Sequence, residues 1–311
     1  MNTASLSILI YHRVLARPDP LFPGEVDARL FERQLRLLKY FFTPLPLPQA
    51  LQRLQDGSLP PRAACITFDD GYADNAQIAL PLLQKHGLHA TFFIASGYLD
   101  GGRMWNDCLI DAVRRAPAPR LDLRELGLDC WPIGTLAQRS AAIAALLAKL
   151  KYLPCRQRQA LSEQVSLRAG GWPGRETEPM LTVAQLRALH QAGMQIGAHT
   201  VRHPILSALP ERQACQEIVD GKTQLEQWLQ TPVDLFAYPN GKRDRDYGAR
   251  HVAMVRELGF TAAVATDWGA SRPGPQLDLY QLPRFTPWDR GRLMFLWRLR
   301  QNLRQTPPDA S

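Results

Sequence analysis

Residues 65–75 read CITFDDGYADN, a short apolar run that ends in two adjacent carboxylates, Asp69 and Asp70, followed by Gly71. A turn needs only one Asp beside a glycine, so the second carboxylate calls for another explanation. Two neighbouring carboxylates raise each other's pKa, which costs stability unless a cation or a chemical task makes use of them. The stretch therefore predicts a buried strand that ends in a candidate functional site.

Apolar runs and helical periodicities alternate along most of the chain around this stretch. Strands are expected at 6–11, 63–68, 90–95, 194–198, 233–238, 260–265 and 279–285, and helices at 27–40, 74–86, 182–192, 210–229 and 246–258. Repeated βα alternation predicts an α/β fold with a parallel sheet, either open or closed into a barrel, and in both the chemistry collects at the carboxyl ends of strands. Residues 105–175 are rich in Ala, Leu and Arg and predict a mainly helical insertion within a single domain spanning 1–311.

The composition sets limits on location and partners. The chain has 311 residues, a formal net charge of +8 and five scattered cysteines without a Cys-x-x-Cys pair, which predicts reduced thiols and no cysteine metal site. Its arginines are spread out along the chain, so we expect no nucleic-acid partner. An anionic membrane surface or a phosphate-bearing substrate explains the positive charge at least as well as nucleic acid does. Asn2 to Val14 is too short to span a bilayer and lacks signal-peptide features, so we expect a cytoplasmic protein.

Polar residues follow two further predicted strands. His199 and His203 stand four apart, the spacing that places two imidazoles on one face of a helical turn, and the third stretch is Tyr238-Pro239-Asn240. Two histidines and one carboxylate leave an open coordination position, which is the catalytic zinc pattern. The alternative is two unrelated surface histidines and an ordinary Asp-Gly turn.

The motifs TFDDG (67–71), HTVRHP (199–204) and FAYPNG (236–241) together resemble the polysaccharide deacetylase family, the metal-dependent de-N-acetylases of carbohydrate esterase family four. YHRV (11–14) and LPRF (282–285) resemble a bacterial branch of this family tied to exopolysaccharide synthesis. The resemblance implies a distorted (β/α) barrel with fewer than eight strands. It also implies hydrolysis of an N-acetyl group from a hexosamine unit.

Matched to the family motifs, Asp69 is the general base, and Asp70, His199 and His203 are the ligands of one divalent ion, expected to be zinc. The resemblance further implies a substrate-binding group in which the backbone N–H of Asn240 stabilises an oxyanion and Thr200 steadies the histidine loop. The other members of this group are Tyr238 and Pro239.

Two family features are absent from the chain. Ala237 stands where the family usually has an arginine that pairs with the base, and no histidine follows His251 to act as the late general acid. We expect Arg284 to pair with Asp69 and His12 to supply the proton, since the first and last strands of a closed barrel are neighbours. The alternative for His12 is a strand-end histidine satisfied by backbone groups.

Several aromatic residues are candidate sugar platforms, although each also suits a protein core: Tyr72, Trp105, Trp268 and Trp288. Residues 291–305 predict a basic amphipathic helix whose apolar face includes Phe295 and Leu299. Such a helix suits peripheral contact with the inner face of a membrane, near a lipid-linked substrate. The alternative is a last helix packed on the barrel.

The sequence thus predicts a metal-dependent hydrolase that removes an N-acetyl group from an N-acetylhexosamine unit of a lipid-linked sugar or polysaccharide precursor. The competing prediction is a non-catalytic carbohydrate-binding or assembly protein that keeps the fold. Ala237 and the missing late histidine favour the second, and the complete Asp-Asp-His-His set favours the first. Metal-dependent acetate release separates the two.

Overall fold

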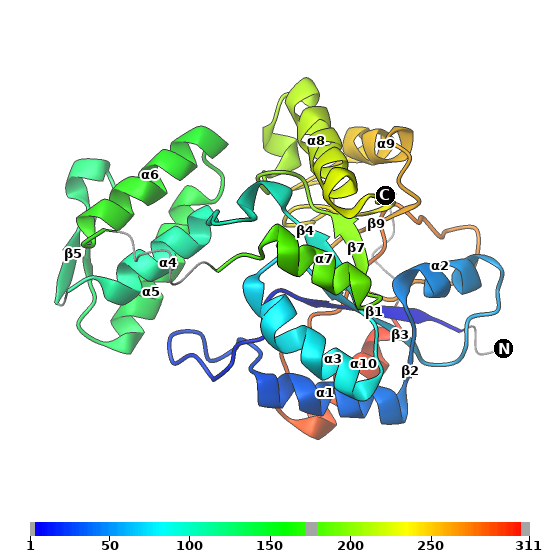
Figure 1. Ribbon diagram of the computed structural model, residues 1–311. Coiled ribbons are helices and arrows are strands. Elements are labelled where there is room, and N and C mark those ends of the chain that lie inside the picture. Colours follow the sequence, from blue (N-terminus) through cyan, green and yellow to red (C-terminus); the bar gives the residue numbers. More distant parts are fainter. Residues whose placement is uncertain (1–3, 118, 172–178, 306–311) are drawn as a thin grey trace. The chain divides into compact units, whose positions relative to one another are not determined.

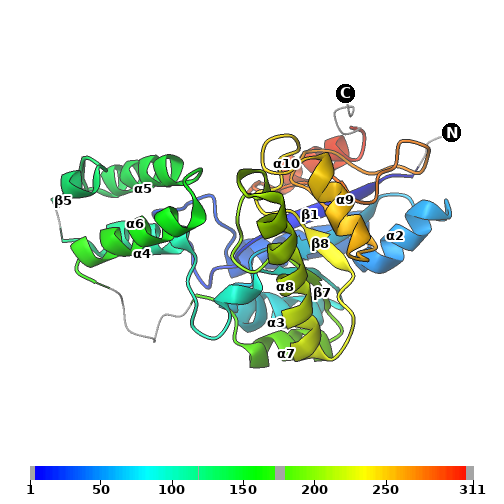
Figure 2. The same cartoon turned by 90° about the horizontal axis from the view of Figure 1, so that it is seen from above.

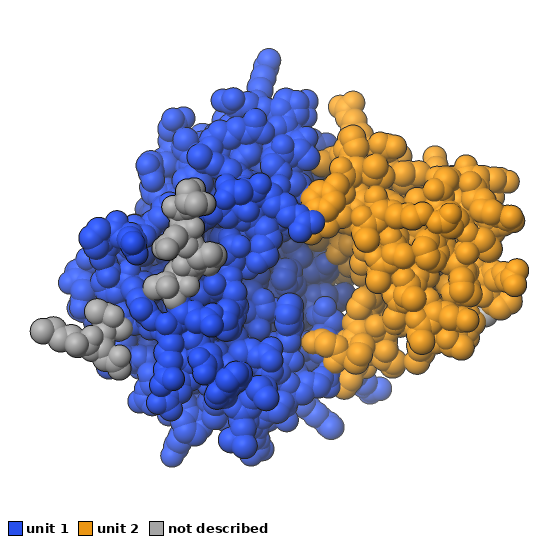
Figure 3. All heavy atoms as spheres, turned by 180° about the vertical axis from the view of Figure 1, so that it is seen from behind, with its two compact units in different colours: residues 1–17, 25–100, 180–311 blue, residues 18–24, 101–179 orange. Residues whose placement is uncertain are grey.

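The structure is a computed structural model that describes residues 4–117, 119–171 and 179–305. The chain divides into two compact units, coloured in Figure 3. The larger unit comprises Met1–Arg17, Glu25–Asp100 and Met180–Ser311, and the smaller comprises Pro18–Gly24 and Gly101–Pro179. Each unit has a hydrophobic core of its own.

A parallel sheet forms the centre of the larger unit (Figure 1). Its strands run in the order β1 (Leu6–Tyr11), β3 (Ala63–Phe68), β4 (Thr91–Ile94), β7 (Gln195–Ala198), β8 (Leu235–Ala237) and β9 (Ala262–Val264), and the short β2 (Thr43–Pro44) also pairs with β3. All these pairings are parallel, and Tyr11 lies opposite Phe68, which lies opposite Phe92. The carboxyl ends of the strands therefore lie together along one edge of the sheet.

The sheet curls until its first and last strands are joined by the segment after β9. Leu282 bridges Val264 in parallel, and Phe285 bridges Leu9 in parallel. The amide of Phe285 donates to Ile8 O at 2.7 Å, and Leu282 O accepts from Ala265 N at 2.8 Å. This confirms the predicted distorted (β/α) barrel. The strand expected at 279–285 is reduced to single bridges, because Pro283 has no N–H to donate to a ladder.

Helices cover the sheet, and local signals set their ends. They are α1 (Ala28–Phe41), α2 (Leu47–Gln55), a π-helical turn (Asn75–Ala79) leading into α3 (Leu80–His86), α7 (Val183–Gln191), α8 (Glu211–Leu229), α9 (Ala249–Glu257) and α10 (Arg292–Asn302). Asp27 caps α1 by accepting from the Arg29 and Leu30 amides, and Thr182 forms a capping box on α7. The helix predicted at 74–86 widens to a π turn ahead of Pro81, which cannot donate the usual backbone bond.

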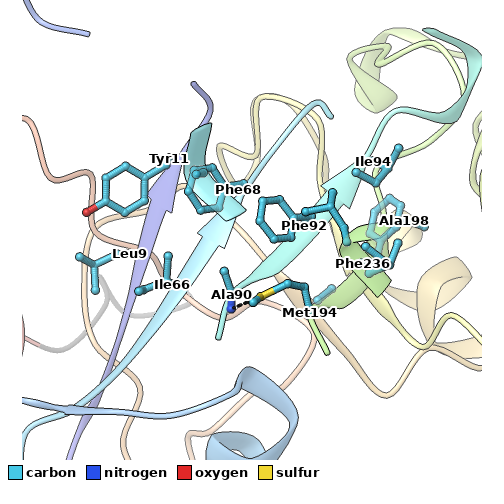
Figure 4. Packing of buried hydrophobic residues seen from close by; sticks show 14 of the residues in the cluster. Leu9, Tyr11, Ile66, Phe68, Ala90, Phe92, Ile94, Met194, Ala198 and Phe236 are labelled. Carbon is cyan, nitrogen blue, oxygen red and sulfur yellow. Dashed lines mark hydrogen bonds between the residues drawn. The ribbon is translucent and has the colours of Figure 1, made fainter. Parts of the chain in front are cut away.

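The sheet is buried on both faces, which explains its nearly continuous apolar strands. Figure 4 shows one face, where Tyr11, Phe68 and Phe92 lie side by side on neighbouring strands. The ring centroids of Tyr11 and Phe68 are 5.3 Å apart, and those of Phe68 and Phe92 are 4.8 Å apart. In Figure 2, α8 runs alongside β7, which it contacts. This helix is therefore in place to support the loop that follows β7.

The smaller unit contains α4 (Trp105–Arg115), α5 (Leu136–Leu150), α6 (Cys155–Arg168) and an antiparallel pair of short strands, β5 (Arg120–Asp122) and β6 (Cys130–Pro132). Trp105 is buried in its core, with the Arg158 guanidinium 4.8 Å from its ring centroid. Trp105 is therefore a packing residue and not the sugar platform that the sequence suggested. Residues 118 and 172–175 of the predicted insertion lie outside the described residues, and its status as part of one domain stays a prediction.

The apolar face of α10 is buried in the core of the larger unit. Phe295 and Leu299 are inaccessible to solvent, and Asn302 accepts from the Ser7 hydroxyl and donates to Gly269 O. The prediction that this face meets a membrane was wrong, because the same apolar stripe packs against the barrel. Among the described residues, no helix is long and apolar enough to span a bilayer.

Candidate active site

Residues from several strand ends face one cavity of about 1010 Å³ in the larger unit. Seven of the predicted site residues line it: His12, Asp69, His199, His203, Asn240, Trp268 and Trp288. They follow β1, β3, β7, β8 and β9 in the chain. The parallel sheet therefore brings together side chains that are far apart in sequence.

Asp70, His199 and His203 form a compact group of potential metal ligands. Asp70 Oδ1 lies 3.6 Å from His199 Nε2 and 3.5 Å from His203 Nε2, and the three ligand atoms all lie within 4.8 Å of one another. His199 Nδ1 donates to Ala237 O at 2.7 Å, which leaves Nε2 with its lone pair on the side of Asp70. The carbonyl of Ala237 thus orients a potential ligand, although Ala237 stands in place of the arginine of the family motif.

The environment of Asp70 fits a cation. Its Oδ1 atom is buried and accepts no hydrogen bond from the described part of the chain, which is unfavourable for a carboxylate oxygen unless an ion balances it. Burial opposes ionisation of Asp70, but the charges of His203 and its other neighbours His199 and His12 outweigh it and hold the pKa of this carboxyl well below its usual range. One anionic oxygen and two imidazoles suit a divalent ion such as zinc.

The two histidines do not share a helical turn, so the geometric premise of the sequence argument was wrong. The chain leaves β7 in a loop where Thr200 has φ 64° and His203 has φ 50°, both in the left-handed region. The imidazole centroids are nevertheless only 4.7 Å apart. The Thr200 hydroxyl donates to His199 O and accepts from His203 N at 3.1 Å, so Thr200 steadies the loop from a buried position.

Helix α8 supports this loop through two residues that the sequence analysis missed. Glu217 accepts from the backbone amides of Val201 and Arg202 at 3.1 and 2.8 Å and from Arg202 Nε at 3.0 Å. Gly221 lets the helix approach closely, because a Cβ at this position would lie 2.8 Å from the Thr200 carbonyl carbon. A lone glycine inside a helical pattern was the available signal for this contact.

Asp69 is held by Arg284 of the closing segment. Arg284 Nη1 and Nη2 each donate to one oxygen of Asp69 at 2.7 Å, and its Nε donates to Ala265 O at 2.7 Å. Burial opposes ionisation of Asp69, but the charge of Arg284, with that of His199, outweighs it and holds the pKa of Asp69 below its usual range. The predicted pair is thus present in the structure, and it keeps Asp69 in the form that can accept a proton.

His12 stands at the end of β1 with its side chain exposed to the cavity. Its backbone carbonyl accepts from Asn75 Nδ2 at 3.0 Å, whereas its imidazole makes no hydrogen bond to the described residues. The alternative expectation, a histidine satisfied by backbone groups, therefore holds only for the main chain of His12. Its imidazole remains available to a bound molecule.

The loop after β8 contributes one lining residue. Asn240 has φ 59° and borders the cavity, and its carbonyl accepts from the Thr266 hydroxyl at 2.7 Å. Tyr238 is buried and stacks on Tyr247 at 3.8 Å between centroids, and Pro239 is buried too, so neither lines the cavity. We therefore assign these two residues a packing role beside the predicted substrate-binding asparagine.

The aromatic candidates differ in placement. Trp268 and Trp288 line the cavity and are 38% and 66% exposed, so their rings are open to a ligand. Tyr72 is buried away from the cavity lining, and the Arg13 guanidinium covers its ring at 4.6 Å from the centroid. Its ring face is thus already occupied, which argues against a sugar platform. Trp297 of α10 also lines the cavity and was missed by the sequence analysis.

Comparison with known proteins agrees with this fold and site. The family model for polysaccharide deacetylases matches residues 56–118 and 161–263, more than half of the chain. The chain belongs to the polysaccharide deacetylase family, as its motifs indicated. Bacillus subtilis YxkH, whose name assigns it to the polysaccharide deacetylases, is 22% identical over 270 residues, covering 86% of this chain and 67% of YxkH.

Solved structures show the same fold. The Streptococcus pyogenes deacetylase PplD, in complex with acetate, matches with a TM-score of 0.63 at 19% identity, covering 97% of this chain and 99% of that one. IcaB from Ammonifex degensii matches with a TM-score of 0.59 at 20% identity, covering 95% and 97%. A de-N-acetylase from Aggregatibacter actinomycetemcomitans also has a TM-score of 0.59, at 16% identity with 95% and 99% coverage.

Proposed function

We propose that this chain is a zinc-dependent carbohydrate de-N-acetylase that hydrolyses the acetamido group of an N-acetylhexosamine unit. One observation carries the proposal: a carboxylate held ionised by Arg284 stands directly beside an Asp-His-His ligand group in the same cavity. The family membership of the chain and the acetate bound in the related PplD structure support this choice.

The chemistry follows from the properties of these side chains. Zinc bound by Asp70, His199 and His203 would lower the pKa of a water molecule and polarise the acetyl carbonyl. Asp69 accepts the proton of the attacking water, since Arg284 holds its carboxylate in the ionised form. The Asn240 amide N–H donates to the oxygen that becomes negatively charged when the carbonyl is attacked.

Breaking the amide bond requires a proton on the leaving nitrogen, because an amine leaves poorly as its anion. His12 is the donor that we propose, since its imidazole faces the cavity and histidine is the side chain that most often serves as a general acid. The products are acetate and a sugar with a free amino group. Trp268 and Trp288 offer apolar ring faces to the sugar.

We propose a lipid-linked sugar or polysaccharide precursor as the substrate, in a pathway of exopolysaccharide synthesis. The basic charge of the chain is compatible with a phosphate-bearing carrier, and the cavity has room for more than one sugar unit. The cytoplasmic location expected from the sequence stays a prediction.

The second candidate is a non-catalytic carbohydrate-binding protein, which Ala237 and the absence of a late histidine favour. Arg284 weakens this argument, because it supplies the guanidinium that the motif around Ala237 lacks. A chain that only binds sugar has no need of a buried arginine paired with this carboxylate, since such a pair is costly to desolvate.

The test is an acetate-release screen over N-acetylhexosamine oligosaccharides and polyprenyl-linked N-acetylhexosamines. We expect release that stops with a chelator and returns with added zinc. The matched control is Asp69→Asn, which should keep bound zinc by elemental analysis and lose turnover. Zinc-loaded protein that binds these sugars and releases acetate from none of them would establish the binding function instead.

A further inference from the structure

The exposed side of α10 carries an unusual group of large apolar side chains. Leu293 is 83% exposed, Trp297 56% and Met294 48%, and Trp288, just before the helix, is 66% exposed. Leu293 and Trp297 are four residues apart and Met294 and Trp297 three, so all three lie on one side of the helix. We call these four residues the rim patch. Its side of the helix differs from the one that packs into the core through Phe295 and Leu299.

The rim patch is surrounded by positive charge. Residues 288–305 contain five arginines, Arg290, Arg292, Arg298, Arg300 and Arg304, and a single acidic residue, Asp289. Asp289 is paired with Arg298 at 3.3 Å. Arg292 and Arg300 are exposed and form no ion pair with any described residue. Arg300 follows Trp297 by three residues, so its charge extends the same side of the helix.

The rim patch also borders the active-site cavity. Trp288 and Trp297 both line the cavity and are both more than half exposed, so they stand at its mouth. A surface that binds the rim patch is therefore next to the opening through which substrate enters.

We propose that the rim patch docks on a lipid bilayer that carries anionic headgroups, which places the cavity mouth at the membrane surface. Tryptophan prefers the interface, leucine and methionine insert among the acyl chains, and arginines attract the headgroups. The rim patch and the arginines around it therefore match such a bilayer in both polarity and charge. The inference rests on the proposed function for its purpose, because it brings the reactive carboxylate to sugars carried on lipid.

The experiment is co-sedimentation of the full chain with vesicles of phosphatidylcholine alone or mixed with phosphatidylglycerol. The wild-type chain should bind the mixed vesicles and release them as salt rises, since screening weakens headgroup attraction. Leu293→Glu with Met294→Glu should reduce the bound fraction about tenfold, because two charges then oppose insertion. Arg292→Glu with Arg300→Glu should remove the preference for phosphatidylglycerol.

The matched control is Leu136→Glu with Leu167→Glu, which adds the same two charges at exposed leucines of the smaller unit and should bind like the wild type. Acetate release from a soluble oligosaccharide should be equal in the wild type, the control and the Leu293/Met294 variant, which also shows that they fold. Vesicle binding with no acetate release would contradict the proposed function alone.

Two results would overturn the docking proposal. One is equal binding of the wild type and the Leu293/Met294 variant to mixed vesicles, or no binding by either, while acetate release persists. The other is a wild-type dimer that the same variant converts to a monomer, with no vesicle binding, which would assign the rim patch to a second copy of the chain.

Discussion

Replacing Gly221 by alanine tests whether α8 positions the loop that carries His199 and His203, the proposed metal ligands. The added Cβ would lie 2.8 Å from the Thr200 carbonyl carbon and 2.9 Å from its oxygen, closer than any ordinary contact. Both atoms are backbone, so relief requires the loop or the helix to shift by about half an ångström, rather than a rotamer change. Thr200 bridges His199 and His203, and a shift therefore reaches both ligands.

The substitution has two opposing effects on the free energy of unfolding and a separate effect on metal affinity. Overpacking costs about 1–3 kcal/mol, and exchanging glycine for alanine inside a helix returns about 1 kcal/mol, so we expect a net loss of about 0–2 kcal/mol. Disturbing the residues that hold metal ligands in place typically lowers metal affinity by about 10–100-fold. We therefore expect a large loss of zinc affinity and only a small loss in the free energy of unfolding.

Zinc affinity by chelator competition and unfolding of the metal-free chain measure the two effects separately. The matched control is Gly248→Ala, where nothing lies within 4 Å of the added atom and zinc affinity should not change. Glu217→Gln should weaken zinc in the same direction, because its carboxylate holds the Val201 and Arg202 amides. Wild-type zinc affinity in Gly221→Ala would refute the positioning role of α8.

Three further outcomes are expected. Asp70→Asn should lose bound zinc in elemental analysis while keeping the fold, because the neutral amide removes the anionic ligand; full retention of zinc would contradict the assignment. His12→Ala should lower turnover by roughly a hundredfold at unchanged zinc content, and its loss should not add to that of Arg284→Lys, because both act in the same reaction; near-normal turnover would exclude His12 as the acid. Burial, helped by the charge of Arg250, lowers the pKa of His251 in the folded chain, so the unfolded chain binds more protons at this residue. The free energy of unfolding should therefore fall as the pH drops below about 6.5, the ordinary pKa of histidine. His251→Gln should weaken this pH dependence when the free energy is measured by urea titration, and an unchanged pH dependence would contradict the prediction.

The sequence predicted the elements of the fold well, because periodicity and caps are local signals. Asp27 and Thr182 cap the helices predicted at 27–40 and 182–192, and the strand before Asp69 ends where its apolar run ends. Two prolines account for the differences between the predicted and the observed elements. A π turn precedes Pro81, and the strand predicted around Pro283 is reduced to single bridges. Both follow from the missing N–H of proline, but its effect on neighbouring hydrogen bonds depends on tertiary contacts.

The site was predicted less evenly. The ligand set and the Arg284 contact followed from motifs and from barrel closure, but the spacing of His199 and His203 suggested a helix that is not there. Left-handed φ at Thr200 and His203 has no local signal, since neither residue is glycine or asparagine, and the Glu217 contact that holds the loop between them comes from a distant helix. Trp297 was missed because periodicity reveals the buried stripe of α10 and says nothing about what borders the cavity on its other side.

The pairing of Asp69 with Arg284 has a consequence for how the protein is made. These residues are separated by 215 positions, and Ser7 and Asn302, which hold β1 to α10, by 295. A chain emerging from the ribosome therefore contains Asp69 long before the arginine that neutralises it, and burying Asp69 alone is strongly unfavourable. The nascent barrel should remain open until Arg284 and Asn302 have left the ribosome, so the proposed site and the closed core should form together.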